Sequence, residues 1–292
     1  MALRLQPFPY QGSKRNLAEK IARHFPVQTT RLVEPFAGSA AMSIFAAQHR
    51  LVDRFIINDS YEPLINLWQA IIKDPETCAA KYEKLWTEQL DDPNEYYYKV
   101  REEFNESSDP VKFLYLMARC VKNAVRFNSS GQFNQSPDKR RLGRRPDEMR
   151  KQIISTALIF KNKATFCSAD YEEILQNTVS GDLVYMDPPY QGTSTKKDSR
   201  YHQGLNFERF VKNLEELNTR DVPYILSFDG SMGGKIYGKP LPSHLMLDKI
   251  AIHAGRSAQA TLNGDDHLTI ESLYLSPAIN RTLSLESLLV AA

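Results

Sequence analysis

The stretch that decides the fold is "LVYMDPPYQG", residues 183–192. Leu183 to Met186 are typical of a buried strand, and they run directly into Asp187, two prolines and Tyr190. Ligands of open α/β sheets bind at the carboxyl ends of the strands. We therefore predict that this segment presents a carboxylate, a stiff backbone and an aromatic ring to a ligand.

The composition is that of a globular protein without a membrane span. The chain has 292 residues, 42% of them hydrophobic and 25% charged, with a formal net charge of only +2. No apolar run reaches the roughly 18 residues that a membrane-spanning helix needs, and the N-terminus lacks the apolar region of a signal peptide. Cys78, Cys120 and Cys167 are far apart and odd in number. We expect reduced thiols in a cytoplasmic protein, with neither a disulfide framework nor a metal site.

Strands and helices alternate at both ends of the chain. "TRLVEPFAGSA" predicts a strand ending near Glu34, a glycine turn and a helix from about Ala40, and "RFIINDS" predicts a second strand followed by a helix to about Lys73. Further strands are expected in "ATFCSAD", "GDLVYMD" and "VPYILSFDG", and helices at 13–25 and 207–217. "HLTIESLYLS" alternates like an antiparallel edge strand. The pattern favours a mostly parallel α/β sheet.

The alternation stops near residue 74. Residues 75–125 look helical and rich in charged and aromatic residues, and residues 126–146 are irregular and polar. We therefore expect a discontinuous domain of residues 1–73 and 151–292, interrupted by a mostly helical insertion at 74–150.

Two features near the first strand predict a nucleoside site. Gly38 allows a tight turn and close approach of a ligand to the backbone. Asp59, 21 residues later, could accept hydrogen bonds from ribose hydroxyls. Both features also fit a nicotinamide dinucleotide fold. The G-x-G-x-x-G pattern is absent, however, so a nucleoside without a pyrophosphate fits better.

The "DPPY" segment predicts chemistry on an exocyclic amine. The lone pair of such an amine on adenine is delocalised into the ring, and acceptors that hold its two hydrogens make the nitrogen more nucleophilic. The carboxylate of Asp187 and the carbonyl of Pro188 can be those acceptors, because Pro188 and Pro189 stiffen the backbone and bring no competing N–H. Tyr190 can stack on a base that has left the duplex. Catalysis would then rest on positioning and electrostatics, with the reactive methyl group coming from a cofactor.

The motifs resemble those of the Dam-like DNA adenine-N6 methyltransferases, the alpha class of S-adenosylmethionine-dependent amino-methyltransferases. The segments that carry the resemblance occur in the family's order: "YQGSK", "LVEPFAGSAA", "INDSYEPLINLW", "RFNSSGQFN", "CSADY", "VYMDPPY" and "ILSFDG". The resemblance implies a Rossmann-like methyltransferase sheet with an inserted, mostly helical target-recognition region.

The resemblance also implies roles for individual residues. Asp59 would hold the ribose of S-adenosylmethionine, Asp170 would hold its adenine amino group, and 187–190 would form the catalytic loop. Residues 227–229, Ser-Phe-Asp, would flank the pocket of the target base. The full set implied for the cofactor is Tyr10, Gly12, Lys14, Glu34, Pro35, Phe36, Ala37, Gly38, Ser39, Asp59, Asp170, Tyr171 and Asp187.

DNA contacts are expected from the polar part of the insertion. By the resemblance, "RFNSSGQFN" is a hairpin that enters DNA, with Phe127 as an apolar wedge beside the extruded base. Phosphates and base edges would be contacted by Arg126, Asn128, Gln132 and Asn134. The run "KRRLGRR" is either a solvated face or a phosphate contact, through Lys139, Arg140, Arg141, Arg144 and Arg145. The polar loop 254–264 would close over the site or touch DNA.

We expect methyl transfer from S-adenosylmethionine to the N6 amine of adenine in double-stranded DNA. Related enzymes methylate cytosine N4, where Ser commonly replaces the Asp, or glutamine and RNA adenine, where Asn is usual. A non-catalytic DNA-binding or regulatory protein that kept the fold is a further alternative. Asp187 and the long insertion favour the DNA adenine enzyme. We expect a cytoplasmic protein of prokaryotic or phage origin, a monomer or weak dimer, with a cognate restriction endonuclease as a candidate partner.

Overall fold

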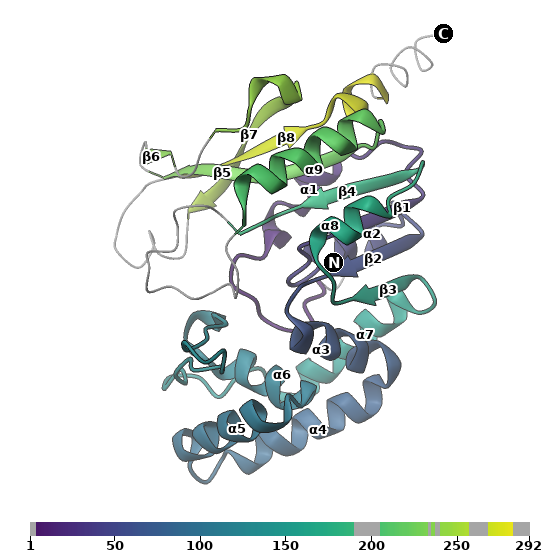
Figure 1. Cartoon of the computed structure of the whole chain (residues 1–292). Helices are drawn as coiled ribbons and strands as arrows, with labels where there is room; N and C mark the ends of the chain where they lie inside the picture. Colours follow the sequence, from purple (N-terminus) through teal and green to yellow (C-terminus); the bar gives the residue numbers. More distant parts are fainter. Residues whose placement is uncertain (1–3, 190–204, 233–234, 237–239, 257–267, 283–292) are drawn as a thin grey trace.

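The computed structural model describes residues 4–189, 205–232, 235–236, 240–256 and 268–282 (Figure 1). Its centre is a sheet with the strand order β3-β2-β1-β4-β5-β8-β7, and β6 pairs with β5 beside this row. The strands are β1 (Arg31–Glu34), β2 (Arg54–Asn58), β3 (Ala164–Cys167), β4 (Asp182–Met186), β5 (Tyr224–Met232), β6 (Lys235–Ile236), β7 (Asp248–Arg256) and β8 (Leu268–Leu275).

The row of strands contains one reversal of chain order. Strands β1 to β5 are parallel, whereas β8 runs antiparallel to both β5 and β7. The chain proceeds outward from β1 through β2 to β3 and then returns to β4, on the other side of β1. A ligand crevice forms at the carboxyl ends of the strands where such a reversal occurs. The predicted Rossmann-like methyltransferase sheet is confirmed, and by this rule a ligand crevice is expected at the ends of β1 and β4.

Helices cover both faces of the sheet, because successive strand residues point to opposite faces. Leu32 and Leu183 join the core on one face, and Val33 and Val184 join the core on the other. The first face carries α1 (Ala18–Ala22), α2 (Ala41–Gln48), α3 (Glu62–Lys73) and α7 (Pro146–Phe160). The second carries α8 (Tyr171–Gln176) and α9 (Phe207–Thr219) (Figure 1). All five residues of β4 are buried, as expected for a central parallel strand.

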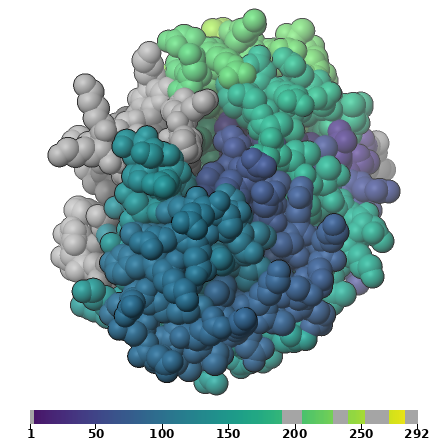
Figure 2. All heavy atoms as spheres, turned by 60° about the horizontal axis from the view of Figure 1, so that its bottom comes forward, coloured from purple at the N-terminus to yellow at the C-terminus, as the bar shows by residue number. Residues whose placement is uncertain are grey.

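The insertion is helical because Asp-Pro pairs start its helices. Asp74, Asp92 and Asp109 each precede a proline, and each side chain accepts hydrogen bonds from amides of the following first turn. The helices so begun are α4 (Pro75–Glu88), α5 (Pro93–Ser107) and α6 (Pro110–Arg119). Helices α4 and α6 pack on α3, α4 also packs on α7, and α5 packs on α6, so the insertion shares one continuous core with the sheet. Figure 2 turns these helices toward the reader.

The described parts of the chain differ from the predicted elements in several places. The helix expected at 13–25 is a short 3-10 turn, η1 (Lys14–Asn16), followed by α1, since Ser13 makes no cap bond. The strand β8 is internal because β7, which the sequence analysis missed, pairs with its outer edge. The short helix α8 was also missed. Finally, α7 continues through residue 150 and packs on α3 and α4, so the proposed domain limit falls inside a helix.

The remaining short elements are η2 (Val121–Asn123) and η3 (Ser243–Leu245). Within the described ranges, no helix combines the length and apolar character that a membrane crossing requires. The same ranges hold no group of three or more side chains arranged to ligate a metal ion.

Candidate active site

Asn58 ties together the carboxyl ends of three neighbouring strands. Its side-chain amide donates to the carbonyls of Pro35 at 2.9 Å and Ala169 at 3.1 Å, and its Oδ1 accepts from the amide of Ala169 at 2.9 Å. The backbone carbonyl of Asn58 also accepts from Ala37 N–H at 2.8 Å. The side chain is fully buried, so these bonds replace those that water would make. The sequence analysis assigned no role to Asn58.

The glycine turn and the predicted ribose carboxylate are joined directly. Gly38 has φ of 49° and donates its N–H to Asp59 Oδ2 at 3.0 Å, while Asp59 Oδ1 accepts from Tyr61 N–H at 3.0 Å. A Cβ at Gly38 would lie only 3.0 Å from the ring of Tyr10, so the turn requires glycine. Burial raises the pKa of Asp59. Gly38, Asp59 and Tyr61 are therefore linked by hydrogen bonds at the carboxyl ends of β1 and β2.

Asp187 lies at the carboxyl end of β4, directly after its buried residues. The side chain is 20% exposed, and its Oδ1 lies 3.5 Å from the ammonium of Lys14. That ammonium is also 2.8 Å from Oε2 of Glu271 on β8, and the Lys14 side chain is only 7% exposed. Pro188 is buried and Pro189 half-buried, whereas Tyr190 lies outside the described residues. The predicted catalytic carboxylate therefore lies at the carboxyl edge of the sheet with a buried cation beside it.

Glu34, predicted as a cofactor contact, is hydrogen-bonded to the start of α2 in the structure. It is 2% exposed, and its Oε1 accepts from the backbone N–H of Ser43 in α2 at 2.6 Å. Burial raises the pKa of Glu34 from 4.5 to about 7; the hydrogen bonds from Ser43 oppose this shift and the charge of Asp187 adds to it. Glu34 therefore anchors the start of α2, and its contact with the cofactor stays a prediction.

Replacing Glu34 with glutamine should change how stability depends on pH. Below about pH 4.5 the group is protonated in both states, and between pH 4.5 and 7 only the unfolded chain ionises. The contribution of Glu34 to the free energy of unfolding of the wild type therefore falls by about 3 kcal/mol as the pH rises from 4.5 to 7. Urea unfolding at about pH 5 and pH 8 should show a smaller decline for Glu34→Gln. Exposed Glu62→Gln is the matched control, and an equal decline in both variants would contradict the prediction.

Asp170 and Tyr171 start α8 and meet an arginine that the sequence analysis did not single out. Asp170 Oδ1 accepts from the backbone N–H of Glu172 at 2.9 Å and from Arg209 at 2.8 Å, and Oδ2 accepts from Arg209 at 3.1 Å. The Arg209 guanidinium also lies 5.3 Å from the ring centre of Tyr171. The rings of Phe36 and Tyr171 are 5.0 Å apart, which joins the ends of β1 and β3.

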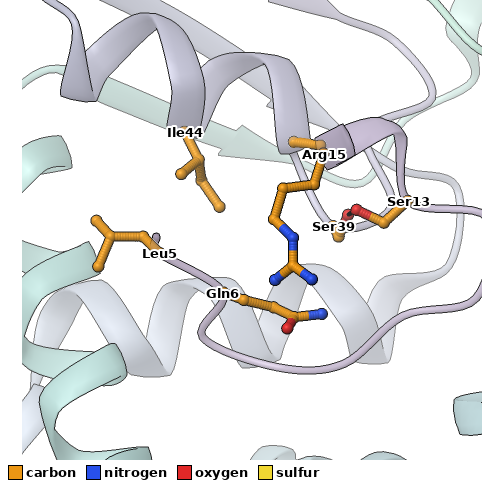
Figure 3. A pocket seen from close by; sticks show the side chains of 7 residues that line it. Leu5, Gln6, Ser13, Arg15, Ser39 and Ile44 are labelled. Atoms are coloured by element: carbon orange, nitrogen blue, oxygen red, sulfur yellow. Dashed lines mark hydrogen bonds between the residues drawn. The ribbon is translucent and has the colours of Figure 1, made fainter. Parts of the chain in front are cut away.

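The N-terminal segment that contains Gly12 contacts the turn before α2, where Ser39 lies. Ser39 donates its hydroxyl to that of Ser13 at 2.8 Å, beside a pocket that Figure 3 shows. The pocket has a volume of about 10 Å³, enough for a single water molecule, so it is not a substrate pocket. Gly12 is exposed and has φ of 84°. The predicted N-terminal motif is therefore brought to the start of α2.

The predicted DNA hairpin is present, and α5 holds it in place. Phe127 and Phe133 pair across the hairpin, and the amide of Asn134 donates to the carbonyl of Arg126 at 2.9 Å. The side chain of Asn105 in α5 accepts from Phe133 N–H at 2.8 Å and donates to Phe133 C=O at 3.0 Å. Asn105 thus completes the hydrogen bonding of the hairpin's edge as another strand would.

A polar groove of about 240 Å³ separates α5 from the hairpin. Its α5 wall includes Arg101, Glu102 and Glu106, and Asn128, Gln132 and Asn134 line the opposite wall. Three of the predicted DNA contacts therefore share one groove, and Arg126 is exposed beside it.

Two predicted DNA contacts are placed differently from expectation. Phe127 is only 7% exposed, and its ring centre lies 4.8 Å from that of Tyr61, so it packs in the core and does not stand out as a wedge. Arg144 is half-buried and donates to the backbone carbonyl and side chain of Gln6, and burial lowers its pKa. Arg144 therefore fixes the insertion to the N-terminal segment.

The other cations of the run "KRRLGRR" are exposed: Lys139, Arg140, Arg141 and Arg145. Arg141 is paired with Asp138 at 2.6 Å. In the predicted base-pocket motif, Ser227 and Phe228 are each 1% exposed, and Phe228 stacks on Phe210 at 5.9 Å. The side chain of Asp229 is outside what the structure describes. Of the loop 254–264, residues 254–256 belong to β7 and the rest lies outside the described residues.

The fold and the crevice together define the class of protein. The strands β1 to β5 are parallel, and the order in which the chain visits them reverses between β1 and β4. The glycine turn, Asp59 and Asp187 lie at the carboxyl ends of these strands, which is the arrangement of a Rossmann-like methyltransferase. Residues 10–232 match the family described as D12 class N6 adenine-specific DNA methyltransferase. The chain belongs to this family, and it is a DNA N6-adenine methyltransferase.

Curated relatives carry concordant names. The chain is 30% identical over 268 residues to the retron Ec67 DNA adenine methylase of Escherichia coli, which covers 86% of this chain and 87% of the relative. It is 29% identical over 198 residues to the DNA adenine methylase of Serratia marcescens, covering 66% and 70% of the two chains. It is 26% identical over 259 residues to the type II methyltransferase M.MjaIII of Methanocaldococcus jannaschii, covering 80% and 89%.

Proposed function

We propose that this protein transfers a methyl group from S-adenosylmethionine to adenine N6 at specific sites in double-stranded DNA, with Asp187 as the catalytic residue. The observation that carries the proposal is the position of Asp187. It is a partly exposed carboxylate at the end of β4. This strand pairs with β1, which the glycine turn follows, and Asp59 follows β2 on the other side of β1.

The residues of the crevice fit S-adenosylmethionine. Asp59 accepts one backbone N–H at each oxygen, so lone pairs remain for the ribose hydroxyls. Gly38 and the ring of Tyr10 offer a close-packed surface to the methionine part. Arg209 and the amide of Glu172 use three acceptor positions of Asp170, which leaves about one for the adenine amine. The Tyr171 hydroxyl is buried with no hydrogen-bond partner among the described residues, so it is available to a ligand.

The chemistry follows from the acceptors at the end of β4. S-adenosylmethionine would supply the electrophilic methyl group. Asp187 and the carbonyl of Pro188 would each accept one hydrogen of the adenine N6 amine and so direct its lone pair. As the new N–C bond forms, the bond between the methyl carbon and the sulfonium sulfur would break and the donor would leave as a neutral thioether, while the carboxylate of Asp187 would accept one N6 proton. Tyr190 would stack on the extruded base.

The DNA side of the proposal rests on the insertion, taken as residues 74–150. The exposed cations of the "KRRLGRR" run would bind phosphates, and the hairpin with its groove would read base edges. Because Phe127 is packed in the core, it is not part of the proposed contacts. The set consists of Arg126, Asn128, Gln132, Asn134, Lys139, Arg140, Arg141 and Arg145.

The test is to express the chain in a host without adenine methylation and to sequence the genomic DNA by a method that reads N6-methyladenine. We expect methylated adenines within one short shared motif. Purified protein should also bind S-adenosylmethionine in calorimetry. Methylation scattered without a motif would contradict site specificity, and methylation without binding of S-adenosylmethionine would contradict the proposed donor.

Cellular context remains a prediction. Free thiols at Cys78, Cys120 and Cys167 fit a reducing cytoplasm. A cognate restriction endonuclease, and action as a monomer or weak dimer, are likewise proposed on the resemblance alone.

A further inference from the structure

The chain has two tryptophans, and they differ in what their indole N–H groups contact. Trp68 in α3 donates its Nε1–H to the carbonyl oxygen of Gly38 at 3.2 Å. Trp86 in α4 has a buried Nε1 with no hydrogen-bond partner among the described residues. Trp68 is not among the predicted site residues, yet its indole is bonded to the glycine turn at the end of β1.

Aromatic rings from three other parts of the chain fix the orientation of the Trp68 indole. Its ring centre lies 5.0 Å from that of Phe8, 6.2 Å from that of Phe160 and 5.7 Å from that of Phe166. These residues belong to the N-terminal segment, to α7 and to β3. Trp68 is fully buried, and an indole that is packed on several sides keeps one orientation. The hydrogen bond to Gly38 therefore comes from a fixed donor.

Trp68 and Asp59 hold the two sides of Gly38. The N–H of Gly38 donates to Asp59, and its carbonyl accepts from Trp68. The peptide that joins Gly38 to Ser39 is trans, so its C=O and N–H point in opposite directions. Because the carbonyl points to the buried indole, the N–H of Ser39 points away from it. This N–H donates to no backbone carbonyl of the described residues, so it is available to a ligand.

We propose that Trp68 is a positioning residue of the cofactor site. By holding the Gly38 carbonyl, it directs the N–H of Ser39 toward the carboxylate in the methionine part of S-adenosylmethionine. The inference rests on the proposed use of this donor. A hydrogen bond to a carboxylate is charge-assisted, and an N–H that is already directed needs no reordering of the turn when the ligand binds. Trp68 thus acts on the ligand only through the glycine turn.

The test compares two thioether ligands by calorimetry in the absence of DNA. S-adenosylhomocysteine and methylthioadenosine share the adenosine and the sulfur, but only the first carries the amino-acid part. Trp68→Phe removes the indole N–H and keeps an aromatic ring. In this variant the ratio of the dissociation constants, methylthioadenosine over S-adenosylhomocysteine, should fall by about tenfold, the effect of losing one hydrogen bond to a charged group. A purely structural role would change both affinities alike and leave the ratio unchanged.

Trp86→Phe is the matched control. It makes the same chemical change at an indole whose N–H has no partner among the described residues, so the ratio should stay at the wild-type value. An unchanged ratio in Trp68→Phe, or an equal fall in both variants, overturns the inference and leaves the proposed function intact. A wild-type protein that binds neither ligand overturns the proposed donor and the inference together.

Trp86→Phe also allows a measurement that does not depend on the folding of Trp68→Phe. Trp68 is then the single tryptophan, and its fluorescence reports on the surroundings of its indole N–H. Binding of S-adenosylhomocysteine should shift the emission, because an acceptor on the N–H side of a peptide polarises its carbonyl. Methylthioadenosine, which leaves the N–H of Ser39 without that acceptor, should shift it less. Equal shifts with the two ligands, or no shift with either, overturn the inference.

Discussion

Asp187→Ala is expected to lower the rate of methyl transfer by at least about 100- to 1000-fold, the loss typical of removing one preorganised group that stabilises a transition state. The carboxylate lies at the end of β4 with 20% of its side chain exposed, and the proposed mechanism places the target base beside it. Without it, one N6 hydrogen has no acceptor and the departing proton has no base. Single-turnover methylation of a DNA duplex containing the recognised motif measures the loss.

The same variant should still bind S-adenosylmethionine, with a dissociation constant within about tenfold of the wild-type value, or roughly 1.4 kcal/mol. The reason is that Asp59 and the glycine turn are held by their own hydrogen bonds. Asp187→Asn is the matched variant, since it keeps the shape and one acceptor oxygen and should retain more activity than Asp187→Ala. Wild-type turnover in Asp187→Ala would remove the residue from the proposed mechanism.

The position of Asp187 was predictable because it depends on local sequence. A parallel strand buried on both faces reads as an apolar run, and β4 is such a strand. The polar residues that end β1, β2 and β4 must then meet at one edge of the sheet. Gly38 and Asp59, which the sequence analysis predicted as two parts of one nucleoside site, are joined in the structure by a hydrogen bond of 3.0 Å.

The contacts that the sequence did not reveal join segments far apart in the chain. Lys14 meets Glu271, Arg209 meets Asp170, and Asn105 pairs with Phe133. Glu271 in β8, Arg209 in α9 and Asn105 in α5 are each a single polar residue in a longer strand or helix, and nothing in the local pattern indicates the partner. Such pairings follow from strand order and helix packing, which the spacing of hydrophobic residues does not determine.

Phe127 illustrates a different limit of the sequence. An aromatic residue in a polar hairpin is equally typical of an exposed wedge and of an anchor that holds the hairpin to its domain. The structure shows the anchor, because the ring of Phe127 lies among those of Tyr61 and Phe133. The same ambiguity applies to the basic run, where one cation of five, Arg144, is tied to Gln6.

Replacing Arg140, Arg141 and Arg145 with alanine is expected to weaken DNA binding on the order of 100-fold at low salt. All three side chains are exposed, and each cation that neutralises a phosphate releases counterions from the DNA. The slope of log K against log salt should become shallower by about 0.9 for each phosphate no longer neutralised, so by roughly 2.7 in the triple variant. Arg141 will contribute least, because its pairing with Asp138 competes with a phosphate. Fluorescence anisotropy with labelled duplex at several salt concentrations measures both quantities.

Arg144→Ala is the matched control within the same run. Its guanidinium is held by Gln6, so its removal should leave the salt slope unchanged, whereas Arg140→Ala alone should lower the slope by about 0.9. The two single variants remove the same charge from neighbouring positions, and only the surroundings of the two side chains differ. A slope that falls equally in both would mean that Arg144 leaves Gln6 to bind phosphate. A slope that falls in neither would make the run a solvated face, and DNA would then have to be held by the hairpin and its groove.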